Sequence, residues 1–98
     1  MSYLVCCSFD LKNASSQDYE NAYTALKKIG LKKVIATDEG TNVVIPTTAA
    51  IGTFSGSNAR SVRDDIRQRV KDAFTALRLK SEIFIVVGGD WAWGAATT

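Results

Sequence analysis

Histidine is absent from this 98-residue chain, which also holds only two cysteines and one proline. Without histidine, Ser–His–Asp and Cys–His catalysis are excluded, and so are metal sites built on imidazole. Cys6 and Cys7 are neighbours, and neighbours on a strand point to opposite faces. They therefore suit neither a structural disulfide nor a shared metal. We expect two small, buried side chains in a protein of a reducing compartment, the cytoplasm.

Long apolar runs are also absent, since none approaches the roughly 18 residues that a membrane span needs. No basic region precedes the strand-like run at the N-terminus, so no signal peptide is indicated. An apolar content of 46% and a net charge of +2 are typical of a folded domain. The length predicts a single domain over residues 1–98 with a hydrophobic core.

The first half of the chain predicts a strand, a helix and a second strand. "YLVCCSFDL" (3–11) is a short apolar run typical of a central strand. Ser15 is a helix N-cap with Asp18 in the capping-box position, and Gly30 is a C-terminal stop. The helix between them carries its apolar side chains at helical spacing, namely Tyr19, Ala22, Tyr23, Leu26 and Ile29. "LKKVIAT" (31–37) then predicts a strand.

The second half predicts a strand, a helix and a last strand. Pro46 is unsuited to a central strand, so the third strand begins either before it, with a break or bulge, or at about Ala49. It should end near Ser55. A helix is expected from Ala59 to Arg78, and "SEIFIVV" (81–87) is the last strand. The apolar stripe of this second helix comprises Val62, Ile66, Val70, Ala73 and Leu77.

This order, β-α-β-β-α-β, predicts an α+β domain with a ferredoxin-like fold. Two helices would cover one face of an antiparallel four-stranded sheet. "DWAW" (90–93) would begin an extra C-terminal strand, and the stretch from Val43 to Thr48 would form either a distinct protrusion or another partner surface.

The other face of the sheet would be polar if it faced water. Instead, both the 3–11 and the 81–87 strands carry apolar residues on both of their faces. A second copy of the chain is the simplest cover, because symmetric homodimers are the commonest assembly. We expect Phe84, Val86, Trp91 and Trp93 to form the dimer interface. The alternative is that the tail with both tryptophans folds back on its own chain.

Asp10, at the end of the first strand, lies on this second face. In a face-to-face dimer the two copies of Asp10 could approach each other and hold Mg²⁺ or Mn²⁺, which makes Asp10 a candidate metal ligand and catalytic residue. The alternative is that Asp10 caps the turn that follows the strand.

The second helix carries a basic ridge, formed by Arg60, Arg63, Arg67 and Lys71, with Arg78 in the same angular sector and Phe74 at its border. Asp65 and Asp72 lie elsewhere on the helix, and Asp65 can pair with Arg69. A segregated row of cations suits a phosphate backbone, so these four residues are candidates for nucleic-acid binding. A solvated helix flank is the alternative.

Together these segments resemble a known family. "SFDL", "DYENAYTALKKIG", "SVRDDIRQRV" and the closing "GGDWAWG" look like the bacterial CRISPR-associated Cas-two-like proteins, and in particular their stand-alone relatives. A more distant similarity is to the antitoxin endoribonuclease of type V toxin–antitoxin systems. The resemblance implies a ferredoxin-like homodimer, nucleic-acid partners and, for some members, metal-dependent cleavage of RNA or DNA. It matches Asp10 to the family's strand-end aspartate.

Two functions follow as expectations. The first is a homodimeric nucleic-acid-binding protein. If such a protein is catalytic, it would be a divalent-metal-dependent endonuclease. The second is a non-catalytic dimerisation or protein-interaction module, such as an antitoxin or an assembly subunit. Each chain offers only one candidate catalytic carboxylate, Asp10, and no histidine. These are few groups for hydrolysis, which favours binding over catalysis.

Overall fold

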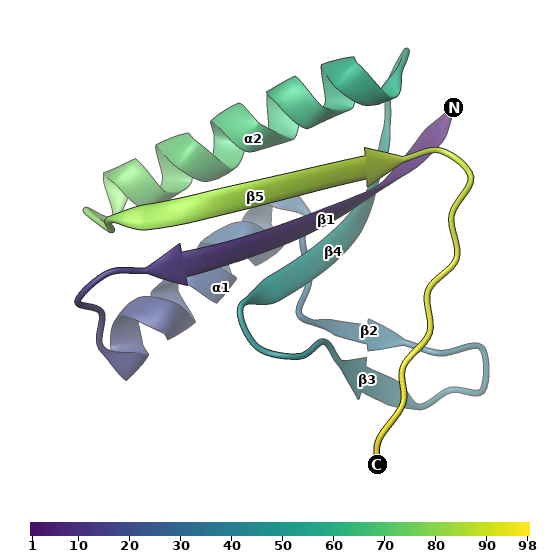
Figure 1. Ribbon diagram of the computed structural model, residues 1–98, viewed down its shortest axis with the longest axis horizontal. Helices are drawn as coiled ribbons and strands as arrows, with labels where there is room; N and C mark the ends of the chain where they lie inside the picture. Colours follow the sequence, from purple (N-terminus) through teal and green to yellow (C-terminus); the bar gives the residue numbers. More distant parts are fainter.

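The computed structural model describes residues 1–98 and has two helices and five strands (Figure 1). In chain order they are β1 (Ser2–Leu11), α1 (Ser16–Ile29), β2 (Val34–Ala36), β3 (Asn42–Val44), β4 (Ala49–Ser55), α2 (Ala59–Ala76) and β5 (Ser81–Gly88). The α+β class is confirmed. Neither helix is long and apolar enough to cross a membrane.

The main sheet has three antiparallel strands in the order β4-β1-β5, so the N-terminal strand is central as its apolar character predicts. Only one β-bridge, between Lys32 and Ile51, continues this sheet beyond β4. After this bridge the chain leaves the sheet, and β2 pairs with β3 in a separate hairpin. The expected fourth strand of the sheet is therefore reduced to a single bridge.

The hairpin contains Val43 and Val44, the first two residues of the stretch expected to protrude, and local bonds explain why it forms. The Thr37 N–H donates to the Thr41 carbonyl at 2.8 Å, which closes the "DEGTN" turn. The Ile45 N–H donates to the Lys33 carbonyl at 2.7 Å, so the 31–36 segment finds its partner here. Pro46 has no N–H with which to extend the ladder. The third expected strand accordingly starts at Ala49 and ends at Ser55, as one of the two alternatives predicts.

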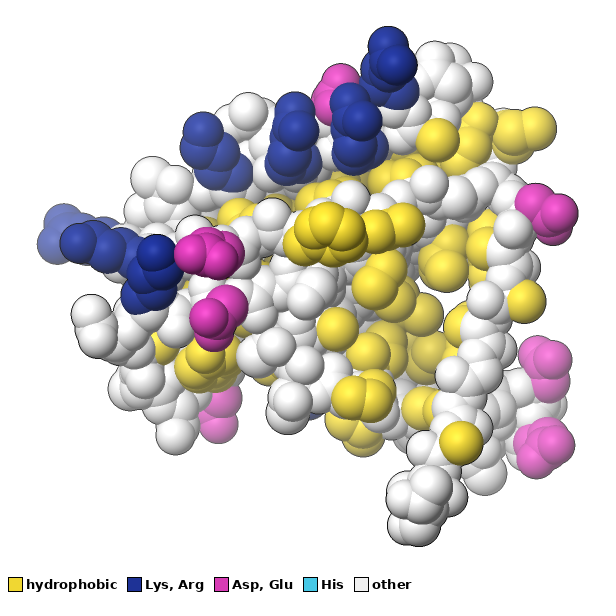
Figure 2. All heavy atoms as spheres, in the orientation of Figure 1, with side chains coloured by type: hydrophobic (Ala, Val, Ile, Leu, Met, Phe, Trp, Pro, Cys, Tyr) yellow, Lys and Arg dark blue, Asp and Glu magenta, His cyan; other side chains and the backbone are white.

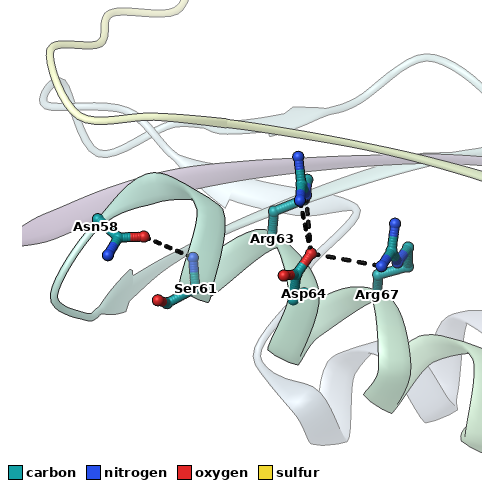
Figure 3. Close-up of polar contacts among 5 residues, drawn as sticks. All are labelled: Asn58, Ser61, Arg63, Asp64 and Arg67. Atoms are coloured by element: carbon teal, nitrogen blue, oxygen red, sulfur yellow. Dashed lines mark hydrogen bonds and ion pairs between the residues drawn. The ribbon is translucent and has the colours of Figure 1, made fainter.

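The helix ends follow the capping signals. Ser15 and Asp18 form the capping box of α1, and Gly30, at φ 112°, ends the helix in the left-handed region that glycine favours. The Asn58 side chain accepts the Ser61 N–H at 2.8 Å and starts α2 (Figure 3). The expected end of α2 at Arg78 is wrong: the helix stops at Ala76, and Arg78 has φ 60°.

Both helices pack on the same face of the main sheet. The Phe9 ring of β1 lies 5.4 Å from the Tyr23 ring of α1 and 5.4 Å from the Phe74 ring of α2. Alternate residues of β1 are buried beneath the helices, namely Tyr3, Val5, Cys7, Phe9 and Leu11. The expected stripe of α2 needs one correction. Phe74 is buried, whereas Leu77 is 40% exposed because the helix has ended before it.

Gly52 in β4 has no room for a side chain. A Cβ at this position would collide with the Gly30 carbonyl oxygen, a backbone atom at the end of α1. We expect Gly52→Ala to destabilise the fold by about 1–3 kcal/mol, because overpacking forces backbone shifts. Urea unfolding measures this loss, and Gly88→Ala is the matched control, since no atom lies near its Cβ. An equal effect of both substitutions would contradict this reading of the contact between β4 and α1.

Candidate nucleic-acid interface

The basic ridge (Arg60, Arg63, Arg67 and Lys71) lies on the exposed side of α2. The adjoining side of the helix is held in the core by four residues at helical spacing, Val62, Ile66, Val70 and Phe74. Because the ridge residues are spaced by three and four positions, they stack along one side of the helix. Figure 2 shows Lys and Arg side chains in a row over α2. The structure thus brings the four predicted cations together on one surface.

Asp64 was missed in the sequence, and it lies inside this row. Its carboxylate accepts from Arg63 at 2.8 Å and from Arg67 at 3.4 Å (Figure 3). The hydrogen bond from Arg63 lowers the pKa of Asp64, and the charges of Arg63, Arg67 and Arg60 act in the same direction. The sequence could have indicated this contact, because Asp64 is four positions after Arg60 and residues at that spacing lie on the same side of a helix.

Arg60 and Lys71 form none of the four ion pairs of the chain, so the two ends of the ridge are free of acidic partners. The expected pair between Asp65 and Arg69 does form, at 3.1 Å. It lies on the other side of α2 and leaves the ridge unaffected. The ridge therefore has two free cations and two that share one carboxylate.

A hollow beside the ridge adds neutral surface to it. Arg67 and Lys71 line this hollow together with residues near the end of α2 and the start of β5. These other lining residues are Phe74, Thr75, Leu79, Ser81 and Ile83. Arg78, expected on the ridge, lies beyond the end of α2. A strand of phosphates laid along α2 would have cations on one side and this hollow on the other.

The face of the sheet opposite the helices, here called the open face, is apolar near its centre. Phe84 is 66% exposed and Val86 is 51% exposed. In the β1–β5 register Phe84 lies opposite Ser8, and Val86 lies opposite Cys6. Figure 2 shows that this apolar surface lies next to the row of cations over α2. A cover over the open face would thus lie beside the ridge.

The C-terminal tail occupies another part of the open face. The expected extra strand is wrong, since no strand follows Gly88. β5 ends at Gly88, and the chain continues without regular structure. Trp91 and Trp93 then line a hollow with Leu4, Ile35 and Ile51. The tail thus runs back along its own chain, but Trp91 and Trp93 each stay 41% exposed, and their place in a dimer interface stays a prediction. Phe84 and Val86 remain uncovered, so the tail does not replace a partner there.

Asp10 is exposed on the open face, directly opposite Glu82 in the β1–β5 register. Glu82 is paired with Lys12 at 3.3 Å. Other groups hold the turn after β1: the Lys12 N–H donates to the Lys80 carbonyl at 2.9 Å, and Ser15 caps α1. No group of three or more possible metal ligands occurs in the chain.

Cys7 does not carry a reactive thiolate. Burial raises the pKa of Cys7 to about 12, and the neighbouring Cys6 thiol adds to the rise. Cys7 is fully buried beneath the helices, as expected, whereas Cys6 is half-buried on the open face. A thiol with so high a pKa is not a nucleophile at neutral pH.

No protein-family model matches this chain, and no curated protein sequence matches it either. The site is therefore interpreted from its own geometry and charge.

Proposed function

We propose that this chain is a homodimeric nucleic-acid-binding protein that acts in the cytoplasm and is related to the Cas-two-like proteins that its sequence resembles. The observation that carries the proposal is the basic ridge on α2, with Arg60 and Lys71 free of acidic partners. Cations segregated along one side of a helix suit the evenly spaced charges of a phosphate backbone. In this proposal the fold is a ferredoxin-like domain in which β2, the fourth strand, pairs with β3 in the hairpin instead of with β4.

The dimer rests on the open face. Phe84 and Val86 are large apolar side chains on a sheet face that water would otherwise contact. A two-fold axis through this face buries both pairs, as symmetric dimers do with self-complementary surfaces. The two ridges would then border the interface on opposite sides, which widens the surface that one nucleic-acid strand can contact.

A binding titration of purified protein against labelled RNA and DNA tests this function. We expect binding whose logarithmic affinity falls steeply with the logarithm of salt concentration. No binding to either polymer would reject the proposal. It would favour the rival function instead, a non-catalytic module whose open face binds a protein partner, as in an antitoxin or an assembly subunit.

Asp64 should weaken binding, because it holds Arg63 and Arg67 and repels phosphate. We expect Asp64→Asn to raise the affinity for an oligonucleotide by about 5-fold at low salt, the effect of one nearby unit charge in water. Asp65→Asn is the matched control, since it removes the same charge from the neighbouring residue. Fluorescence anisotropy compares the two variants, and an equal gain from both would show that net charge alone is responsible.

A metal-dependent endonuclease is the second candidate function. Its specific support is that Asp10 and Glu82 lie opposite each other on the open face, so a face-to-face dimer brings four carboxylates toward one axis. Mg²⁺ or Mn²⁺ held there would supply an activated water and stabilise charge on phosphate. Asp10 would hold the ion, and the ridge would position the strand.

Asp10→Asn separates this candidate from simple binding. If the chain is a nuclease, the variant should lose metal-dependent cleavage on a denaturing gel by at least ~100-fold, because a carboxamide is a poor ligand for Mg²⁺. Binding and the dimer should be retained, because Asp10 is exposed and distant in sequence from α2. Cleavage that persists in the variant would remove Asp10 from the mechanism.

A further inference from the structure

Three lysines line a hollow that is formed by α1 and the segment leading into β2. Figure 1 shows the course of these two elements. Lys27 comes from the last turn of α1, and Lys32 and Lys33 follow the helix. Tyr23, Thr24 and Val34 complete the lining, which contains no acidic residue. We call this site the lysine hollow. Its volume is about 370 Å³, which is in the range of small-molecule sites.

None of the three lysines is neutralised within the chain. The four ion pairs involve Lys12, Arg63, Arg67 and Arg69 as their cations. The last carbonyls of α1 could attract the lysines, but backbone groups already occupy two of them. The Gly30 N–H donates to the Leu26 and Lys27 carbonyls at 3.1 Å each. The three positive charges therefore repel one another with no internal anion to offset them.

The backbone and the ring that shape the lysine hollow are held in place. Lys32 exchanges two backbone hydrogen bonds with Ile51, at 2.7 and 2.9 Å. The Tyr23 hydroxyl accepts the Thr48 N–H at 2.8 Å, and the Lys33 ammonium lies 4.4 Å from the centre of the Tyr23 ring. Such a site is largely preorganised, so less binding free energy is lost in ordering it.

We propose that the lysine hollow binds a phosphate-bearing anion of several charges. The group is either a free polyphosphate, as in a nucleotide, or a run of consecutive phosphates in a nucleic-acid strand. Lysine ammonium groups bind phosphate as point charges with three donors each, and no acid in the lining competes with the ligand. The site shares no residue with the basic ridge, so it goes beyond the function proposed for α2.

Isothermal titration calorimetry with inorganic tripolyphosphate at low salt tests the site. Lys27→Gln should weaken binding by about 10-fold, the loss of one hydrogen bond between charged groups. Lys28→Gln is the matched control: it lies in the same turn and carries the same charge, but it does not line the hollow. It should change the affinity by less than about 2-fold. A wild-type protein that fails to bind tripolyphosphate, or equal losses in the two variants, would overturn the proposal.

A second arm distinguishes the two sources of phosphate. If a nucleic-acid strand is the ligand, Lys27→Gln should reduce the salt slope of oligonucleotide binding by about 1, and Lys28→Gln should not. If a free anion is the ligand, the salt slope of the Lys27→Gln variant stays unchanged while its tripolyphosphate affinity falls by about 10-fold. Arg60→Gln/Lys71→Gln should leave tripolyphosphate affinity within about 2-fold of the wild type. Failure at the lysine hollow is thereby separable from failure of the ridge.

Discussion

Replacing the four ridge cations by glutamine should reduce affinity for RNA or DNA by at least ~100-fold at low salt. The variant Arg60→Gln/Arg63→Gln/Arg67→Gln/Lys71→Gln removes every cation that α2 offers to phosphate on this side. Each lost phosphate contact also removes counterion release, so the salt slope should fall by about 3 for a single strand. All four side chains are exposed or half-buried, so the fold should be retained. Fluorescence anisotropy over a series of salt concentrations measures both quantities.

A matched pair of double variants separates the ridge from net charge. The quadruple variant shifts the net charge from +2 to −2, because 2 − 4 = −2, and this shift alone weakens binding to a polyanion. Arg60→Gln/Lys71→Gln removes the two ridge cations that lack an acidic partner. Lys28→Gln/Arg69→Gln removes two charges elsewhere. If both doubles lose affinity equally, the ridge is not the binding surface.

Phe84→Asp should convert a dimer into a monomer, with association weakened by at least ~100-fold. In a two-fold assembly each substitution acts twice, because the same surface occurs on both subunits. A carboxylate in the centre of the interface would be desolvated without a partner, close to its symmetry mate. Phe84 is 66% exposed in the single chain, so its replacement should leave the fold intact.

Sedimentation equilibrium of the wild type and two variants measures this effect. Gln17→Asp, in the first turn of α1, is the control, because it makes the same charge change at an exposed site away from the open face. Thermal unfolding checks that Phe84→Asp remains folded. A wild type that is monomeric at all concentrations, or a variant that dimerises as tightly, would contradict the proposed interface.

Signals within a few residues of each other predicted the local structure well. Ser15, Asp18 and Gly30 mark the ends of α1 because capping depends on groups within one helical turn. The alternation along β1 likewise predicted which side chains lie beneath the helices, and the alternation along β5 predicted that Phe84 and Val86 lie on the opposite face. These patterns reflect the geometry of the helix and the strand themselves.

Features that depend on distant pairing were harder to predict. The 31–37 segment reads as a strand, but nothing local indicates that it pairs with Asn42–Val44 rather than with β4. The tail was expected to form a strand, yet it has none, and its tryptophans line a hollow together with residues from β1 and β4. The lysine hollow was missed because its lysines lie on both sides of the helix end, where no single periodicity applies. Only the folded chain brings them together.

The most direct test of the proposed function is a map of the bound nucleic acid on the protein. We would record amide ¹H–¹⁵N spectra of the labelled protein during titration with a short single-stranded RNA, and then with DNA of the same sequence. The largest shifts should lie at Arg60, Arg63, Arg67 and Lys71 and around the adjoining hollow, and they should diminish as salt rises. If the amide chemical shifts of α2 stay unchanged, or if neither RNA nor DNA changes any chemical shift, a nucleic-acid interface on this helix would be contradicted.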